Sequence, residues 1–228
     1  MDDKCAHEHH FPSTRHKFAE AEYFLIKLLE FYHAPMEFQF NLNAFIQAIR
    51  NITFMLQSED NKPEGFQKWY ESKQSDMKRN ELLKRFVAAR NIVVKQSSLT
   101  HKSKAWSGMY RGRKMKLAIQ HEIPVLMDTK AALERAKDFA IGLFLDEEHS
   151  AIGEQIGVQR IWVVDELGDQ EVVSICLNVF NYMGHLVAEA LSLFGSNATH
   201  EDINIDMERV QVLLETDVDP SLVDKWGW

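Results

Sequence analysis

Hydrophobic positions recur every three or four residues along most of this chain, which is the spacing of amphipathic helices. Because that spacing places them on one face, each such segment predicts a helix that packs against others. The predicted helices cover residues 14–33, 38–58, a short segment from Phe66, 79–95, 128–145 and 168–194, followed by a last helix that starts near Thr199 and ends before Pro220.

Shorter segments have the pattern of strands rather than helices. Residues 105–110 and 115–123 predict two strands joined across the sequence RGRK, where Gly112 supports a tight turn. Residues 160–165, RIWVVD, predict a further strand. The pattern therefore indicates a mainly α protein, a helical bundle with a small inserted antiparallel β element.

The domain prediction follows from this order of elements and from the lack of a clear linker. We expect a flexible tail over residues 1–13, one α-rich domain over residues 14–220 with its β-hairpin at about 105–123, and a C-terminal tail over residues 221–228.

Residues 79–95 form the most informative of the predicted helices. Its apolar stripe consists of Leu82, Leu83, Phe86, Val87, Val93 and Val94. Arg90 falls on the same face, and a guanidinium keeps its charge and is rarely buried without a partner. This helix is therefore predicted to carry a cation towards the core or towards a subunit interface, with Asn91 beside it and Lys95 one turn further on.

The net charge of -8 conceals an uneven distribution of charges. Residues 82–121 contain ten Lys or Arg and no acid, whereas residues 138–228 contain eighteen acids and three bases. Either the acids face the bases within the fold or between subunits, or the basic segment binds an anionic partner such as RNA. The candidate nucleic-acid-binding residues are Lys102, Lys104, Arg111, Arg113, Lys114 and Lys116.

Composition places the chain among soluble, intracellular proteins. No apolar run approaches the roughly 20 residues of a membrane helix, and the charged N-terminus has no apolar segment of a secretory signal. The two cysteines, Cys5 and Cys176, belong to no CxxC pair. We therefore expect a cytoplasmic protein with reduced thiols and no membrane partner.

Common catalytic motifs are absent from the sequence: it has no Walker A loop, GxGxxG, GxSxG or HExxH. The N-terminal segment CAHEHH holds a thiol and three imidazoles, but closed metal sites draw their ligands from separated elements. Asp146 and His149 have the spacing of a di-metal bundle, without the other ligands that such a site needs. We therefore predict no metal site and no cofactor.

The order of a helix, then Arg90 and Asn91 on the buried face of a later helix, then a loop resembles the HEPN superfamily. The resemblance covers about residues 14–97. It implies a small α-helical bundle, often dimeric, that acts as a metal-independent ribonuclease or as a partner of nucleotidyltransferases. The family signature is Arg, a polar residue, a few mostly apolar residues and then His. Arg90 and Asn91 match it, residues 92–94 suit the spacer, and Lys95 stands where His is expected.

The lysine changes what the resemblance implies for the chemistry. In the family the His acts at an RNA 2'-hydroxyl, while the Arg helps at the phosphate. A lysine with an ordinary pKa of about 10.4 remains cationic at neutral pH and cannot accept that proton, although it can bind phosphate. A second Arg-Asn pair, Arg50 and Asn51, also has no following His.

These patterns leave three hypotheses open. The first is a HEPN-like binding module for RNA or a nucleotide-bearing partner, with little or no catalysis. The second is a metal-independent ribonuclease of HEPN type, in which His101 or another base substitutes for the missing His. The third is a homodimeric structural or interaction protein, in which Arg90 pairs with a buried carboxylate such as Glu30 or Glu37 and the basic hairpin meets an acidic surface.

Overall fold

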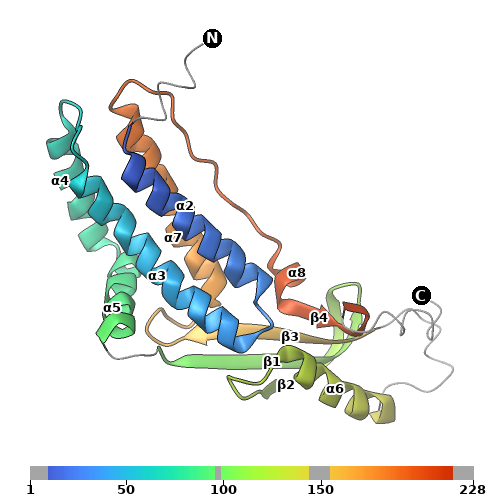
Figure 1. The fold of residues 1–228 in the computed structure, drawn as a ribbon. Coiled ribbons are helices and arrows are strands. Elements are labelled where there is room, and N and C mark those ends of the chain that lie inside the picture. Colours follow the sequence, from blue (N-terminus) through green and yellow to red (C-terminus); the bar gives the residue numbers. More distant parts are fainter. Residues whose placement is uncertain (1–9, 96–98, 144–154, 218–228) are drawn as a thin grey trace. The chain divides into compact units, whose positions relative to one another are not determined.

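The computed structural model of the protein describes residues 10–95, 99–143 and 155–217 (Figure 1). It confirms a mainly α fold with a small β sheet. The helices are α2 Pro12–Glu30, α3 Pro35–Ser58, α4 Phe66–Arg79, α5 Glu81–Lys95, α6 Thr129–Leu143, α7 Val172–Ser192 and α8 Met207–Gln211. The strands are β1 His101–Arg111, β2 Lys114–Glu122, β3 Gln155–Val164 and β4 Val212–Leu214, and a short 3-10 helix covers Glu215–Asp217.

Backbone contacts divide the chain into two compact units, each built from three segments. The helical unit consists of Met1–Leu28, Phe40–Thr100 and Val164–Asn204. The sheet unit consists of Leu29–Gln39, His101–Val163 and Ile205–Trp228. The sequence-based assignment of a single α-rich domain over residues 14–220 stays a prediction.

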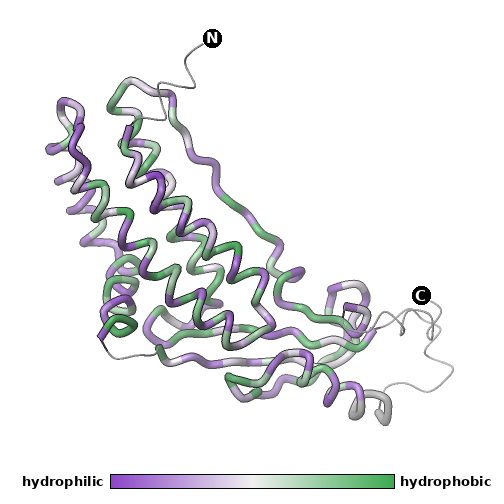
Figure 2. The backbone as a smooth tube through the Cα atoms, in the orientation of Figure 1, coloured by the Kyte–Doolittle hydropathy of each residue, from purple (hydrophilic) through white to green (hydrophobic). Residues whose placement is uncertain are grey.

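The helical unit is built around α7, which is buried along most of its length. Phe180 of α7 stacks on Phe18 of α2, with the ring centroids 4.6 Å apart. The helix is long and apolar enough to cross a membrane, yet 67% of its most apolar window is buried inside the protein. Figure 2 shows hydrophobic and hydrophilic residues alternating around the other helices, as their predicted packing requires. This is the pattern of a core helix surrounded by amphipathic ones.

The sheet unit contains four strands in the order β2-β1-β3-β4. β2 pairs with β1 and β4 pairs with β3, both antiparallel. Gly112, with φ 55°, lies in the turn of the predicted hairpin, where a residue without a side chain adopts the left-handed conformation at no steric cost. One apolar cluster joins β1, β3 and β4 to α6 through Ala105, Met109, Ile123, Ala132, Leu133, Ala136, Ile156, Val158 and Leu213.

The last predicted helix is wrong. Residues 199–206 have no regular structure, α8 spans only five residues, and Val212–Leu214 form a strand instead. The backbone of this strand, β4, pairs with β3, where Gln159 lies opposite Val212. Pairing with a strand about 50 residues earlier overrides the helical pattern of the local sequence.

The boundary of the N-terminal tail also needs correction. Phe11 is only 2% exposed, and its ring contacts those of Phe66 and Phe194. Because α2 begins at Pro12, the packed part of the protein starts before residue 14. Cys5, His7 and His9, the Asp146–His149 pair and the predicted C-terminal tail lie outside the described residues.

Candidate ligand-binding pocket and the predicted basic site

Helix α5 carries the predicted Arg-Asn motif and begins at a well-defined cap. Asn80 Oδ1 accepts hydrogen bonds from the backbone N–H groups of Leu82 and Leu83, at 3.0 and 3.2 Å. These bonds satisfy two of the donors that a helix leaves free at its first turn. The same residue ends α4, because its N–H donates to the carbonyls of Asp76 and Met77. Asn80 therefore fixes the corner between two helices.

The buried face of α5 differs from the predicted one. Leu83, Phe86 and Ala89 are buried, whereas Val87 and Val94 are 41% and 50% exposed. The buried face of α5 is therefore rotated around the helix axis relative to the predicted stripe. A helix has 3.6 residues per turn, so a broad apolar stripe in the sequence does not define which of its residues lie at the middle of the buried face.

Arg90 lies at the edge of the buried face and is half-buried, not sealed in the core. Its guanidinium has no hydrogen bond or ion pair with any residue that the structure describes, so the predicted buried ion pair is not observed there. Asn91 and Lys95 are exposed. Together the three residues place two cations and an amide at the C-terminal end of α5.

The buried arginine is Arg160 of β3, which is 0% exposed. Its guanidinium donates to Ser103 Oγ at 2.8 Å, to the carbonyls of Met127 and Val125 at 2.7 and 2.9 Å, and to Thr129 Oγ1 at 3.1 Å. Burial lowers the Arg160 pKa to about 10, so the group remains charged at neutral pH. Sequence reasoning passed over it because an arginine at the start of an apolar strand looks like a strand end.

Aromatic residues complete the surroundings of Arg160. Its guanidinium lies 3.8 Å from the centroid of Trp162, and Trp162 stacks on Phe38 at 4.7 Å. Trp162 Nε1 donates to the carbonyl of Tyr32 at 2.8 Å, and Tyr32 donates in turn to the Arg160 carbonyl at 3.0 Å. This arrangement ties Leu29–Gln39 to the sheet, so Arg160 has a structural role.

The predicted basic residues of the hairpin separate into two groups. Lys102, Lys104, Arg111, Lys114 and Lys116 are exposed, whereas Arg113 is half-buried.

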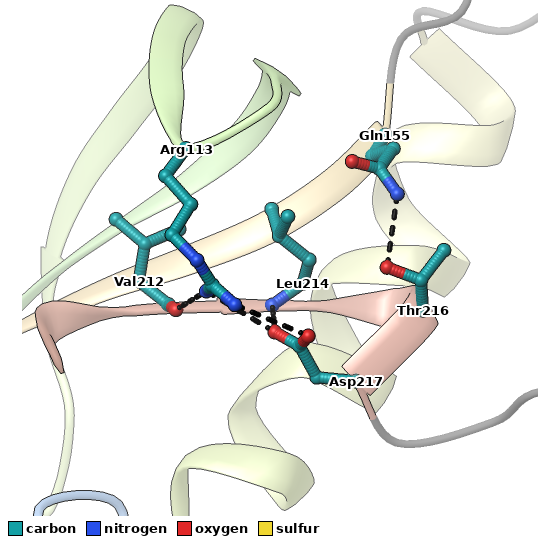
Figure 3. A network of polar contacts seen from close by, with 6 residues as sticks. All are labelled: Arg113, Gln155, Val212, Leu214, Thr216 and Asp217. Carbon is teal, nitrogen blue, oxygen red and sulfur yellow. Dashed lines mark hydrogen bonds and ion pairs between the residues drawn. The ribbon is translucent and has the colours of Figure 1, made fainter. Parts of the chain in front are cut away.

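Figure 3 shows Arg113 directed at the segment that follows β4. Its two terminal nitrogens each lie 3.2 Å from a carboxylate oxygen of Asp217, and it also donates to the Val212 carbonyl. Asp217 accepts a further hydrogen bond from the Leu214 N–H at 2.9 Å. At this point an acid from the C-terminal half meets a base of the hairpin, as one of the two charge interpretations predicts.

The helical unit contains a pocket of about 430 Å³ between α3, α4 and α5, and Met183 of α7 also lines it. Its apolar lining consists of Ile46, Ile49, Met77, Leu83, Phe86, Val87 and Met183. Its polar lining consists of Arg50, Thr53, Gln57, Tyr70, Gln74, Lys78 and Lys84. A largely apolar cavity of this size with a few converging polar groups is typical of small-molecule sites.

Hydrogen bonds hold one wall of the pocket in place. Tyr70 Oη donates to the Thr53 carbonyl at 3.2 Å and accepts from Gln57 Nε2 at 2.7 Å. Arg50 donates to Thr53 Oγ1 at 2.7 Å, and its guanidinium lies 4.3 Å from the ring centroid of Phe54. These contacts position a tyrosine hydroxyl, an amide and a guanidinium before any ligand arrives.

Three cations line the same pocket, namely Arg50, Lys78 and Lys84. Lys84 lies 2.6 Å from Glu81, and this hydrogen bond lowers the pKa of the Glu81 carboxyl. The side chains of Gln74 and Lys78 have no hydrogen bond with the residues described. The pocket therefore offers an apolar surface for a flat group and free donors for an anion.

The described residues that line this pocket include no Cys, His, Asp or Glu. The Cys176 thiol is buried, which raises its pKa well above the ordinary value and disfavours a nucleophilic thiolate. His185 and His200 lie on another part of the helical unit, where they contact Asp202 and Asn181. Among residues 10–95, 99–143 and 155–217 no group of three or more His, Cys, Asp or Glu is placed to hold a metal ion.

Comparison with known proteins gives one family. Residues 3–221 match the model of the family described as bacteriophage lambda protein ea47. No curated protein and no solved structure matches the chain. Since the match covers nearly the whole sequence, the chain belongs to the bacteriophage lambda protein ea47 family.

Proposed function

We propose that this protein is a binding module for a nucleotide, either free or at the end of an RNA chain, held in the pocket between α3, α4 and α5. The observation that carries the proposal is the composition of that pocket, an apolar cavity of about 430 Å³ with three cations in its lining. A nucleotide combines a flat, largely apolar base with an anionic phosphate, and both parts have a counterpart there.

The apolar wall supplies the surface for a base. Phe86 and Ile49 line it, and aromatic and aliphatic side chains of this kind stack on the faces of bases without regard to sequence. Gln57 and Gln74 supply amides that can pair with the polar edge of a base. The cations remain for the phosphate: Lys78, whose side chain has no hydrogen bond to a described residue, and Arg50 and Lys84, which keep further donors beyond their bonds to Thr53 and Glu81.

The Arg-Asn motif lies on the same helix as part of this lining. From Lys84 to Lys95 the axis of α5 extends about 16 Å, with Arg90 between them. Lys84 and Lys95 share one face of the helix, because their separation corresponds to about three full turns, and cations at this spacing suit the phosphates that follow a first bound nucleotide. The HEPN resemblance, which implies an RNA-related role, agrees with this use of α5.

Binding is favoured over catalysis because of Lys95. The position expected to hold the proton-accepting His holds a lysine, and that lysine is exposed at the end of α5. An exposed lysine contacts phosphates through its charge but does not act as a base at neutral pH. The proposal therefore expects RNA to be bound and left intact, and cleavage without added metal that is lost in Arg90→Ala would support the ribonuclease hypothesis instead.

The test is a calorimetric titration of the full chain, first with a 5'-nucleoside monophosphate and then, in a separate experiment, with a short single-stranded RNA. We expect Lys84→Gln to weaken binding of both ligands about fivefold to tenfold, because one charge-assisted contact to phosphate is lost. Lys68→Gln is the matched control, since Lys68 is an exposed lysine of α4 that does not line the pocket. Failure of both ligands to bind at low salt would overturn the proposal, as would equal affinities for Lys84→Gln and wild type.

A further inference from the structure

Strand β2 presents an apolar stripe at the open edge of the sheet. It is the first strand in the order β2-β1-β3-β4, so only β1 pairs with it. Met115, Leu117 and Ile119 are 40%, 52% and 47% exposed, respectively. Because side chains alternate along a strand, these three residues share one face of the sheet. An edge strand with exposed apolar residues is a template for pairing with another strand.

The stripe belongs to the face that α6 covers elsewhere. In the β1–β2 register Leu117 lies opposite Met109, which belongs to the apolar cluster under α6. The helix packs over β1, β3 and β4, and its residues Ala132 and Ala136 line a groove of about 330 Å³ whose other side is formed by Ile119. The apolar face of the sheet therefore continues past α6 onto β2 without a covering element among the described residues.

We propose that a second copy of this chain pairs with β2, so that two β2 strands run antiparallel across a two-fold axis at Ala118. In a symmetric antiparallel pair one residue lies directly opposite its own copy, with the two-fold axis midway between them. This is required because residues directly opposite each other have to point to the same face of the sheet. β2 comprises Lys114–Glu122, and Ala118 is its central residue. Only an axis at Ala118 pairs all nine residues of the strand with nine of the other copy.

The charges along β2 are complementary in this register. Lys114 lies opposite Glu122 of the second copy, and neither residue has an ion pair among the residues described. Within one chain Lys114 faces Arg111, while Glu122 faces Lys104. Since like charges directly opposite each other are destabilising and unlike charges are stabilising, Glu122 of the second copy improves the surroundings of Lys114.

Lysines on an edge strand usually prevent such pairing. Here the two lysines of β2, Lys114 and Lys116, face Glu122 and Gln120 of the second copy instead of each other. On the other face Leu117 lies opposite Ile119 of the second copy, so the two apolar stripes become continuous across the axis. β2 therefore pairs more favourably with β2 of a second copy than with a strand that places a lysine opposite Lys114 or Lys116.

Cross-linking tests the register directly. Ala118→Cys in the full chain, in a Cys5→Ser background, places two thiols directly opposite each other at about 4.5–5.5 Å between Cα atoms, within reach of a disulfide. Native Cys176 is buried and does not interfere. We expect mild oxidation to convert Ala118→Cys to a covalent dimer. Lys116→Cys and Gln120→Cys are matched controls, because each lies about 14 Å from its own copy in this register.

A charge-reversal series tests the same interface without new thiols. Lys114→Glu should raise the dissociation constant of the dimer about tenfold in sedimentation experiments, because each pair then places two acids opposite each other. Glu122→Lys should do the same, and the double variant should recover most of the affinity. Both residues are exposed, so circular dichroism should show an unchanged fold.

Three results would overturn the proposal. The first is a chain that stays monomeric at all accessible concentrations, which would leave the edge to a strand of different sequence. The second is a dimer that cross-links equally at residues 116, 118 and 120. The third is a double charge variant no better paired than the single variants.

Discussion

Arg160 of the sheet unit and Arg90 of the helical unit show two outcomes for an arginine within an apolar segment. Arg160 is 0% exposed and donates four hydrogen bonds, whereas Arg90 is half-buried and has no assigned partner among the described residues. The difference lies in the acceptors. Val125 and Met127 turn their carbonyls towards β3, whereas no described residue accepts a hydrogen bond from the Arg90 guanidinium. Burial of a charge therefore requires acceptors around it and does not follow from its place in a hydrophobic pattern.

The difference also separates structure from function. A guanidinium whose hydrogen bonds are made within the protein has little left for a ligand, as at Arg160. One at the protein surface with its donors free can contact phosphate, as proposed for Arg90.

Replacing Arg160 with methionine should lower the free energy of unfolding by about 3–5 kcal/mol, because the carbonyls of Val125 and Met127 and the hydroxyl of Ser103 lose their donor inside the core. Urea unfolding measures the change. Arg135→Met, on the exposed side of α6, is the control and should change stability by less than about 0.5 kcal/mol. Equal effects of the two substitutions would contradict the structural role of Arg160.

His33 should make the sheet unit sensitive to acid. Burial, followed by the charge of Arg160, lowers the His33 pKa from 6.5 to about 4, so the folded state binds this proton less tightly than the unfolded state does. The free energy of unfolding therefore has its full value above pH 6.5 and falls by about 2–3 kcal/mol as the pH drops towards 4.

Unfolding measured at several pH values checks this prediction by difference. His33→Gln should remove most of the loss between pH 6.5 and 4, while His16→Gln, at an exposed position of α2, should retain it. If the free energy of unfolding of the wild type and of His33→Gln changed in parallel with pH, His33 would not contribute to the acid sensitivity.

Asn80→Ala should cost about 1 kcal/mol, because the N–H groups of Leu82 and Leu83 lose the acceptor that caps α5. Thermal unfolding detects a change of this size. Ser72→Ala is the control, since Ser72 is an exposed residue within α4. A control variant as destabilised as Asn80→Ala would mean that the cap is not the cause.

Arg90→Ala should have the smallest effect on stability, less than about 0.5 kcal/mol, because no partner of its guanidinium is left unsatisfied. Its effect should appear in binding, where the affinity for single-stranded RNA falls and the dependence on salt becomes shallower by about one phosphate contact. A loss of stability comparable to that of Arg160→Met would remove the distinction between the two arginines.

The sequence predicted elements better than it predicted their ends and faces. Helix spacing located α3 and α7, and Gly112 located the hairpin turn, because these signals are local. β4 was missed because a three-residue strand depends on its partner β3. The exposure of Val87 was missed because a stripe of apolar residues does not define which side of it meets the next helix.

The candidate site was predicted only in part. Arg90, Asn91 and Lys95 stand out in the sequence, and the structure places them at the end of α5. The pocket itself was not foreseen, since its lining comes from four helices and includes ordinary core residues such as Ile49 and Met183. The Arg50-Asn51 pair was the one local signal, because Arg50 lines the pocket.

Photo-cross-linking tests the proposed function most directly. A short single-stranded RNA carrying 4-thiouridine at its first position is bound to the full chain, irradiated, and the attached peptides are identified by mass spectrometry. We expect cross-links at Tyr70 or Phe86, in the lining of the pocket. Cross-links confined to the hairpin of β1 and β2, or none at low salt, would contradict it.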